Sequence, residues 1–441
     1  MRLPKFRFYI RLLYAFLRKH QRIIILSLAM TILFVILVPK IIDVDLVRPR
    51  QKIGLVGRYQ PTNLPYEIAS LISYGLTIPL PDGSIEPGLA QSWEVRENGR
   101  IYIFTIKKGV FWHDGTKVVA KDINYNFSDV SATILDEQRI KFELKEPFSP
   151  FPVVVSRPVF KKGLVGLGDY RVRSIKKSGQ IIHKLVLVPA KKEANPNLIF
   201  HFYPNEEAAK TGYKLGEVDY LEDIFFPNEL EGWGNTHIES SIKYDRYTAI
   251  FFNTQTEKFA DKPVRQALAY AIDKKWQPRA LSSFSPDSWA YNSMVKAYDQ
   301  DLKNAKNLLG QNGGQVTIEK INLATVPSLL GIAEQIKADW QKLGIETEIQ
   351  LIHSPSEEFE ALLVSQQIPR DADQYVLWHS TQVTNLSKYK SPKLDKLLED
   401  GRKTLNQDER KKIYQDFQRF LVEDSPAIFL FHPTVYSISR K

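Results

Sequence analysis

Apolar residues recur with the periods of strands and helices through the second half of the chain. Residues 248–254 (TAIFFNT) form an apolar run that predicts a buried strand. Residues 261–275 place Pro263 in a first turn and space their apolar residues as a helix does. Residues 328–344 repeat the helical pattern between two strand-like runs, VTIEKINLAT and IETEIQLI. Strand, helix and strand at this length predict a βαβ unit with a right-handed crossover.

Two more helices and a closing strand follow. A serine before a proline starts the first helix, residues 391–401 (SPKLDKLLEDG), and a glycine ends it. Asn406 and Glu409 have the spacing of a capping box, which predicts the start of the second helix. Residues 427–438 (AIFLFHPTVYSI) then predict a strand near the end of the chain.

The first half of the chain shows mostly short strand patterns. Residues 101–106 carry apolar side chains at both alternating sets of positions, which predicts a strand covered on both faces. Residues 132–144 hold two alternating runs around a turn at Asp136. Residues 197–223 predict strand, helix and strand. We therefore expect an α/β body with more than one lobe.

The N-terminal segment differs from the body in charge and hydropathy. Residues 1–22 carry seven of the ten net positive charges and no acidic residue. The 16 uncharged residues that follow, Ile23–Val38, are nearly all apolar, and a spanning helix uses ~20 such residues. We expect a basic cytoplasmic tail (1–22), a transmembrane signal anchor (23–42) and a linker (43–51), with the body on the extracytoplasmic side, periplasmic or cell-surface. The alternative is a cleaved signal peptide, but no small-residue cleavage site follows the run.

Composition excludes several classes of function. The chain has no cysteine, which rules out disulfides, thiolate metal sites, cysteine nucleophiles and a lipid-attachment cysteine. With the tail set aside, the body is nearly neutral, so charge gives no reason to expect nucleic-acid binding. The eight histidines are scattered and none forms a metal-binding motif. We therefore expect no metal and no cofactor.

Residues 109–127 (GVFWHDGTKVVAKDINYNF) look at first like a site of chemistry. His113 and Asp114 are neighbours, but adjacent strand residues point to opposite faces and cannot form a dyad with each other. The glycines lack the spacing of a phosphate-binding loop, and the chain has no G-x-S-x-G motif. Asp114-Gly115 instead predicts a turn, and the residues from Ala120 onward predict a helix with Asp122 near its positive end. No enzyme is expected.

The same region carries a family resemblance. Residues 80–123 resemble the signature region of the family 5 extracellular solute-binding proteins, the oligopeptide and dipeptide receptors of ABC importers. The matching residues are Gly83, Pro87, Leu89, Ala90, Ser92, Trp93, Phe104, Gly109, Val110, His113, Asp114, Gly115, Ala120 and Asp122. The resemblance continues through residues 165–172, 215–223, 251–275, 298–309 and 389–431, and it spans about 53–435.

The resemblance implies a two-lobed periplasmic-binding-protein fold (type 2) with mixed sheets. Lobe I would comprise residues 52–247 plus 428–441, and lobe II residues 248–427. Such proteins are not enzymes: they close on a peptide or similar small solute by a hinge motion and present it to a permease. We expect a monomer. The alternatives are a surface sensor or partner-binding module without transport, and a secreted hydrolase, which no motif supports.

The resemblance also indicates where a ligand would bind. Peptide-binding members use an aspartate in a G-W-x-x-D-Y segment to hold the amino terminus of the peptide. In the corresponding segment here, residues 377–387, Trp378 matches the tryptophan and Thr381 takes the aspartate position. A cleft with aromatic walls and few polar groups suits a small solute. The candidate contacts are Tyr59, Tyr74, Asn253, Trp378, His379 and Thr381, with Trp378 foremost; the alternative for each is ordinary packing.

Overall fold

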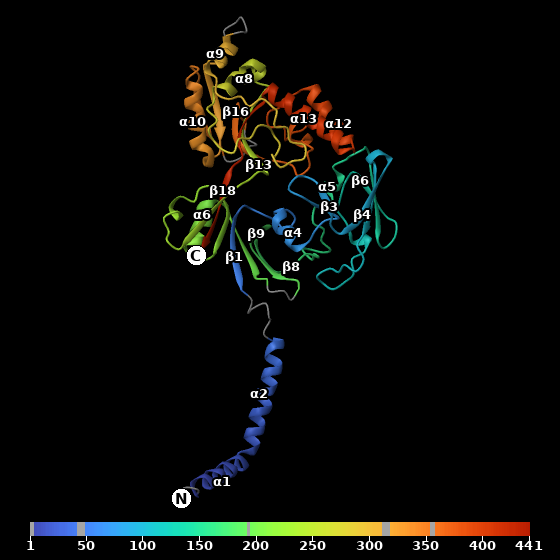
Figure 1. Ribbon diagram of the computed structural model, residues 1–441, viewed down its shortest axis with the longest axis vertical. Coiled ribbons are helices and arrows are strands. Elements are labelled where there is room, and N and C mark those ends of the chain that lie inside the picture. The colour runs from blue at the N-terminus through green and yellow to red at the C-terminus, as the bar shows by residue number, and fades with distance from the viewer. Residues whose placement is uncertain (1–3, 42–48, 192–194, 311–317, 353–357) are drawn as a thin grey trace.

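The computed structural model describes residues 4–41, 49–191, 195–310, 318–352 and 358–441. It is elongated, with two lobes stacked along the long axis and the helices α1 (Pro4–Lys19) and α2 (Gln21–Ile41) extending below them (Figure 1). The mixed α/β two-lobed architecture matches the expectation from the sequence.

Lobe I is built on a seven-stranded mixed sheet. Its central strand β1 (Arg50–Val56) runs parallel to both neighbours, while the outer strands pair antiparallel. The order is β12 (Thr236–Ile242), β18 (Thr434–Arg440), β11 (Tyr220–Ile224), β1, β10 (Asn197–Tyr203), β9 (Ile181–Pro189) and β8 (Tyr170–Ser178). Helices α4 (Tyr66–Ile72) and α6 (Glu206–Lys214) pack on this sheet. A short 3₁₀ turn, Asn228–Leu230, precedes β12.

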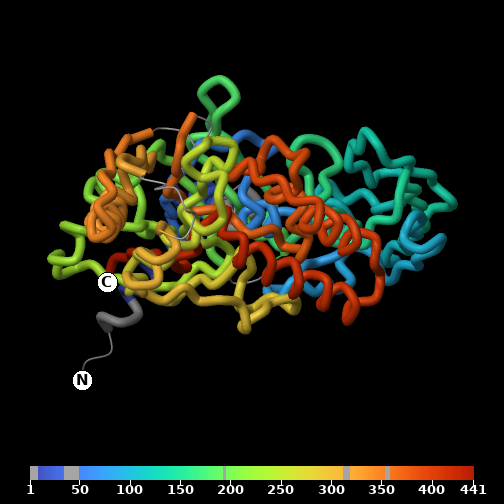
Figure 2. Tube along the Cα trace, turned by 90° about the horizontal axis from the view of Figure 1, so that it is seen from above, coloured from blue at the N-terminus to red at the C-terminus, as the bar shows by residue number. Residues whose placement is uncertain are grey.

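A four-stranded subdomain extends lobe I at one end of the molecule (Figure 2). Its antiparallel order is β4 (Ala90–Arg96), β5 (Ile101–Ile106), β7 (Arg139–Leu144) and β6 (Val130–Ile134). Tyr102, Phe104 and Trp112 are buried in its own apolar core. The hairpin of β2 (Thr77–Pro79) and β3 (Ile85–Pro87) and the helix α5 (Phe151–Val154) lie next to it. One-turn 3₁₀ helices occur at Glu97–Gly99 and Ala120–Asp122.

Lobe II contains the largest apolar core and a five-stranded sheet. The sheet order is β15 (Glu346–Leu351), β14 (Lys320–Thr325), β16 (Ala361–Gln367), β13 (Arg246–Phe252) and β17 (Ala427–Phe431). The helices are α7 (Glu257–Ala260), α8 (Lys262–Ala271), α9 (Leu302–Gly310), α10 (Leu330–Gln341), α11 (Tyr375–Trp378), α12 (Pro392–Lys403) and α13 (Gln407–Asp424), with a 3₁₀ turn at Pro327–Leu329. The predicted βαβ unit is confirmed, because α10 joins the parallel strands β14 and β15.

Two short connections join the lobes. One links β12 to β13 and the other links β17 to β18, and the backbone N–H of Lys243 donates to Pro433 across them at 2.9 Å. The imidazole Nδ1 of His432 lies 2.8 Å from the carbonyl oxygen of Arg246. The chain thus changes lobe around residues 242–246 and 431–434. The closing strand expected at 427–438 is divided, with β17 in the sheet of lobe II and β18 in that of lobe I.

The prediction of a helix from Ala120 onward was wrong. Only one 3₁₀ turn forms there, and the chain is extended again at Ile123. The carboxylate of Asp122 accepts from the backbone of Val119 and from the indole of Trp112, each at 3.2 Å. The turn at Asp114-Gly115 is confirmed: Gly115 has φ +82° and Asp114 accepts from the backbone N–H of the residue two positions on.

The expected membrane-spanning helix at residues 23–42 is not supported. Across the part of the chain that the structure describes, no helix is long and apolar enough to cross a membrane. Side chains of residues 34–42 lie outside the described ones, so the described apolar run ends at Leu33. That run is shorter than the ~20 residues of a usual span.

Candidate functional site

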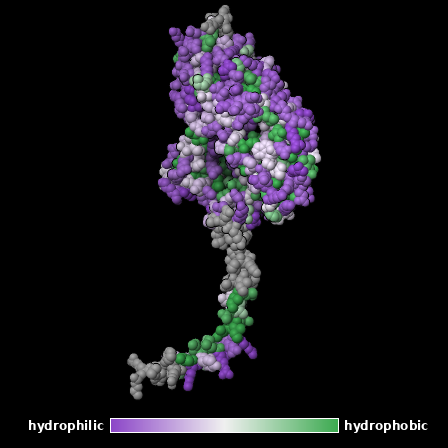
Figure 3. Space-filling model, turned by 45° about the vertical axis from the view of Figure 1, so that its right-hand side comes forward, coloured by the Kyte–Doolittle hydropathy of each residue, from purple (hydrophilic) through white to green (hydrophobic). Residues whose placement is uncertain are grey.

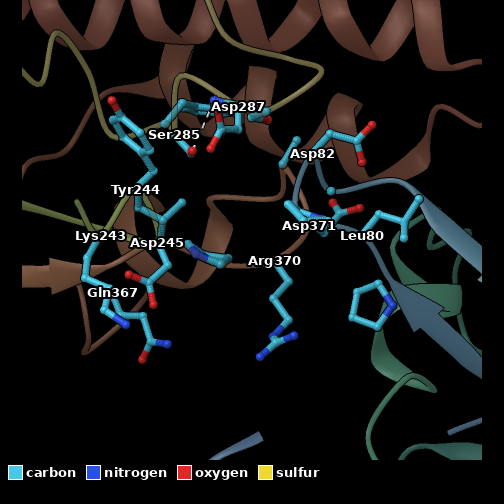
Figure 4. A pocket seen from close by; sticks show the side chains of 18 of the residues that line it. Leu80, Asp82, Lys243, Tyr244, Asp245, Ser285, Asp287, Gln367, Arg370 and Asp371 are labelled. Carbon is cyan, nitrogen blue, oxygen red and sulfur yellow. Dashed lines mark hydrogen bonds between the residues drawn. The ribbon is translucent and has the colours of Figure 1, made fainter. Parts of the chain in front are cut away.

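A cavity of about 420 Å³ lies between the two lobes near the crossing segments. Lobe I contributes Glu67 and residues 79–83, and the first crossing segment contributes residues 242–245. Lobe II contributes residues 284, 285, 287, 288, 367–372 and 374. Figure 4 shows these side chains around the cavity, and Figure 3 shows the molecular surface hollowed where the lobes meet. The volume is within the ~300–1,000 Å³ of small-molecule sites.

A tight turn brings lobe I to the cavity. Asp82 accepts hydrogen bonds from the backbone N–H (2.8 Å) and the hydroxyl (2.6 Å) of Ser84, and Gly83 takes φ +83°. The tip of the turn touches lobe II, because the N–H of Trp289 donates to the Asp82 carbonyl at 3.0 Å. A Cβ on Gly83 would stand 3.0 Å from the carbonyl oxygen of Arg370. Glycine therefore allows the lobes to approach closely here.

Two buried ion pairs hold the opposite wall. Asp371 pairs with Arg410 at 2.7 Å, and Asp373 pairs with Arg402 at 2.8 Å. Burial alone would lower the pKa of Arg410, but the adjacent carboxylate of Asp371 raises it above its ordinary value. Burial raises the pKa of Asp373, and Arg402 opposes this only in part. Breaking such a buried pair is costly, so residues 371–374 form a fixed wall.

Gln374 is the unusual residue of this wall. Its side chain is fully buried and lines the cavity, yet in the described part of the chain neither its amide nitrogen nor its amide oxygen has a hydrogen-bond partner. Leaving a buried polar group unpaired costs about 1–3 kcal/mol. The amide can donate two hydrogen bonds and accept two, so a turn of this side chain into the cavity would let a polar ligand remove the cost.

The lining is rich in acidic side chains. Two basic residues, Lys243 and Arg370, face five carboxylates, those of Glu67, Asp82, Asp245, Asp287 and Asp371. Lys243 is paired with Asp223 at 2.6 Å, and Arg370 is paired with Glu67 at 3.2 Å. Among the described residues, Asp82 and Asp287 have no ion-pair partner. The cavity therefore presents excess negative charge.

The structure places three of the expected ligand contacts together behind this wall. Trp378 ends α11, is 3% exposed, and packs its ring 5.8 Å from Phe251 in the core of lobe II. His379 is also buried, and its Nδ1 lies 2.8 Å from the hydroxyl of Thr381. None of the three lines the cavity. They do adjoin it, since the backbone N–H of Trp378 donates to the Gln374 carbonyl at 3.1 Å.

The other three expected contacts lie apart from one another. Asn253 follows β13, and its amide donates to the Phe359 carbonyl at 3.3 Å. The hydroxyl of Tyr59 donates to the Val56 carbonyl at 3.2 Å, and burial raises its pKa. Tyr74 is half-buried beside the four-stranded subdomain. None of them lines the cavity either.

Sequence reasoning did not single out the residues that line the cavity. Two signals in the sequence could have pointed to them. One is the PDGS sequence, residues 81–84, a strong turn signal whose tip is the contact between the lobes. The segment IPRDADQ, residues 368–374, carries two aspartates directly after β16, which is unusual for a segment that is mostly buried.

A second cavity of about 670 Å³ separates the four-stranded subdomain from lobe II. Its wall includes Phe127, Phe148, Tyr375 and Arg402, with the guanidinium carbon of Arg402 3.8 Å from the Tyr375 ring centre. Within the described residues, no buried side-chain atom in its lining lacks a hydrogen-bond partner. The first cavity is therefore the stronger candidate for a ligand site.

Comparisons with known proteins agree with this arrangement. Residues 84–389, more than half of the chain, match the model of the bacterial extracellular solute-binding proteins, family 5 Middle. The dipeptide-binding protein of Escherichia coli K12 is 24% identical, covering 85% of this chain and 86% of that protein. Heme-binding protein A of Haemophilus influenzae is 23% identical, covering 83% of each.

Solved structures share the fold. NikZ of Campylobacter jejuni, in complex with Ni(L-His), superposes with a TM-score of 0.73 at 24% identity and covers 89% of this chain and 94% of that one. AppA of Bacillus subtilis, in complex with a nonapeptide, gives a TM-score of 0.70 at 20% identity and covers 89% and 95%. At these identities the likeness establishes the two-lobed fold.

Proposed function

Because the chain belongs to the bacterial extracellular solute-binding proteins of family 5, we propose that it encloses a peptide or similar small solute between its lobes and delivers it to the permease of an ABC importer. The observation that carries this proposal is the cavity between the lobes, with the unsatisfied amide of Gln374 in its wall. A site made from both lobes and their crossing segments can open and close by movement at the hinge.

Contacts between the lobes support a closing motion. Away from the hinge, the N–H of Ser149 donates to the Arg402 carbonyl at 2.7 Å, and Trp289 donates to the turn at Asp82. These contacts form only when the lobes are together. A ligand that touches both lobes adds to them and shifts the population toward the closed state.

The six contacts expected from the sequence enter this proposal in two ways. Trp378, His379 and Thr381 act on the ligand through α11, because Gln374 is the residue from which α11 starts. Tyr59, Tyr74 and Asn253 stay predictions as direct contacts.

The proposal includes a tether to the cytoplasmic membrane through the N-terminal segment. The support is the basic tail and the exposed apolar side chains of α2, among them Ile23, Leu26 and Met30, on a helix that extends away from the lobes (Figures 1 and 3). Alkaline carbonate extraction of membranes tests the tether. We expect the chain to stay in the membrane pellet, whereas its release into the supernatant would exclude an integral anchor.

The binding proposal is tested on the full chain purified in detergent. Native mass spectrometry would look for a co-purified solute, and thermal unfolding would be followed against pooled di- and tripeptides. A ligand at a hundredfold excess over its dissociation constant stabilises by about 2.7 kcal/mol. A bound mass or a clear rise in Tm supports the receptor function. If no bound mass is found and no rise in Tm occurs, the result favours a sensor or partner-binding module without a solute.

A further inference from the structure

The charge balance of the cavity indicates what kind of solute it accepts. Both basic side chains in the lining are already neutralised, Lys243 by Asp223 and Arg370 by Glu67. Asp245 and Asp371 are compensated as well, by Arg246 at 3.1 Å and Arg410 at 2.7 Å. The negative charge that remains belongs to Asp82 and Asp287.

These two carboxylates come from different lobes. Asp82 lies in the turn of lobe I and Asp287 in the loop 284–288 of lobe II; both line the cavity, at separate places in Figure 4. Hydrogen bonds from the side chain and backbone of Ser84 lower the pKa of Asp82, so it is ionised at neutral pH. A cation in the cavity would be attracted by both lobes at once, which favours the closed form.

Gln374 gives a second, independent indication of a ligand. Its amide is fully buried without a partner and lines the same cavity as the two carboxylates. Carboxylates alone would be satisfied by water or sodium ions. An amide with no partner calls for a group that both donates and accepts hydrogen bonds, as a peptide carbonyl and N–H do.

We infer that this cavity selects cationic ligands, namely short peptides bearing positive side chains, with cationic groups beside Asp82 or beside Asp287 and a peptide unit on Gln374. The inference rests on the proposed function and goes beyond it by naming the class of solute. Apolar and acidic peptides of the same length are expected to bind more weakly.

The test uses the full chain in detergent with four probes: Lys-Lys-Lys, Ala-Ala-Ala, Glu-Glu-Glu and the polyamine spermidine, which is cationic but has no peptide unit. Calorimetry and thermal unfolding at low and moderate salt would rank them. We expect Lys-Lys-Lys to bind at least tenfold more tightly than Ala-Ala-Ala, with the advantage shrinking as salt rises. Equal binding of the three tripeptides would overturn the inference and leave the proposed function intact.

Substitutions of the two carboxylates test whether they cause the preference for cationic peptides. Asp82→Asn and Asp287→Asn should each lower the affinity for Lys-Lys-Lys much more than the affinity for Ala-Ala-Ala, so that the two affinities approach each other. The matched control is Asp408→Asn, an exposed carboxylate at the start of α13 outside the cavity, and it should change neither. An unchanged preference in both cavity variants would refute the assignment of the cation site.

Spermidine distinguishes the preference for cations from the binding of peptides. If spermidine stabilises the chain and no tripeptide does, the peptide part of the proposed function fails while the preference for cations stands. Failure of every probe counts against both. A variant that lowers all affinities equally is checked for folding by its unfolding curve without ligand, and a normal curve then contradicts a charge-specific role.

Discussion

Arg370 of lobe II meets Glu67 of lobe I, with the guanidinium Nη2 3.2 Å from the carboxylate Oε1, and both side chains line the cavity between the lobes. The guanidinium also lies over the ring of Tyr66, 3.5 Å from its centre. One arginine of the ligand-site wall thus makes two contacts with the other lobe. These contacts exist only while the lobes are closed.

Arg370→Gln should therefore shift the chain toward the open form. The pair is exposed, so its loss costs about 0.2–1 kcal/mol of the closed state, with a further small loss from the ring contact. We expect ligand affinity to fall severalfold and the radius of gyration without ligand to rise in X-ray scattering. Arg419→Gln is the control, because Arg419 pairs with Asp416 inside α13 at 2.8 Å. If the two variants behave alike, Arg370 does not help to hold the lobes closed.

Gln374→Leu should separate stability from binding. Removing an amide that has no partner relieves a desolvation cost, so the free energy of unfolding without ligand should stay within about 1 kcal/mol or rise. Affinity for a peptide should fall about tenfold, because its polar group would then face a methyl group. Unfolding curves with and without ligand measure both effects.

A matched glutamine in the same lobe controls this experiment. Gln418 is equally buried, but its amide is fully engaged, accepting from Ser282 (2.9 Å) and Asn292 (3.0 Å) and donating to Ala290 (2.8 Å). Gln418→Leu leaves those partners unpaired and should destabilise by about 1–3 kcal/mol or more. Equal destabilisation by the two substitutions would mean that Gln374 has a structural partner in solution.

Lys274 should give the chain a pH dependence unrelated to the ligand. Its ammonium is buried among the carbonyls of Ala269, Ile272 and Tyr298, and burial lowers its pKa to about 7. Between this pKa and the ordinary value near 10.5, the unfolded chain binds a proton that the folded chain does not. The free energy of unfolding should then rise with pH, by up to about 1.4 kcal/mol per pH unit.

The measurement is chemical denaturation between pH 6 and 9, with Lys274→Met as the comparison. The variant should lose the part of the slope above pH 7 that the lysine contributes. It also unpairs three carbonyls, so its stability at any single pH is not diagnostic, and only the slope is compared. The same slope in both proteins would show that Lys274 stays protonated when folded.

The elements that the sequence predicted well are those with local signals. The helix α12 starts at Ser391, whose hydroxyl accepts from the N–H of Leu394, and α13 starts at Asn406, which accepts from Glu409. Cap and helix lie within four residues of each other, so no distant contact is needed to set them. The βαβ unit follows the same logic over a longer stretch.

Where distant contacts determine the backbone conformation, the prediction from local sequence was wrong. The expected helix after Ala120 is replaced by an extended segment whose Tyr125 hydroxyl donates to the Val155 carbonyl at 2.6 Å. The guanidinium of Arg157 donates to the Tyr125 carbonyl at 2.6 Å. Both partners lie about thirty residues away, so tertiary contacts override the local preference for a helix.

The candidate ligand site also combines residues that a sequence signal indicates with residues that only distant contacts bring into place. The family resemblance led to residue 378, close to the cavity in sequence and structure. It did not lead to Gln374, because a single glutamine in a polar segment has no periodic signal. Its special character comes from burial by residues far away in the chain. The excess of carboxylates likewise emerges only when the turn at Asp82 meets lobe II.

Trp378 now permits a sharp test of two roles. If it supports α11 from behind, Trp378→Phe should keep most of the packing against Phe251 and Phe429 and leave ligand affinity nearly unchanged. Trp378→Ala should destabilise lobe II by about 3–5 kcal/mol through the cavity it leaves, and should weaken binding because α11 loses its packing against Phe251 and Phe429.

A direct contact predicts a different pattern. Affinity would fall at least tenfold in Trp378→Phe while the Tm without ligand barely moved, since the indole nitrogen would then be a partner of the ligand. That nitrogen is buried without a hydrogen-bond partner among the described residues, so it could donate to any ligand that reached it. The ring contacts with Phe251 and Phe429 favour the supporting role, because Trp378 packs in the core of lobe II and does not line the cavity, whereas Gln374 does.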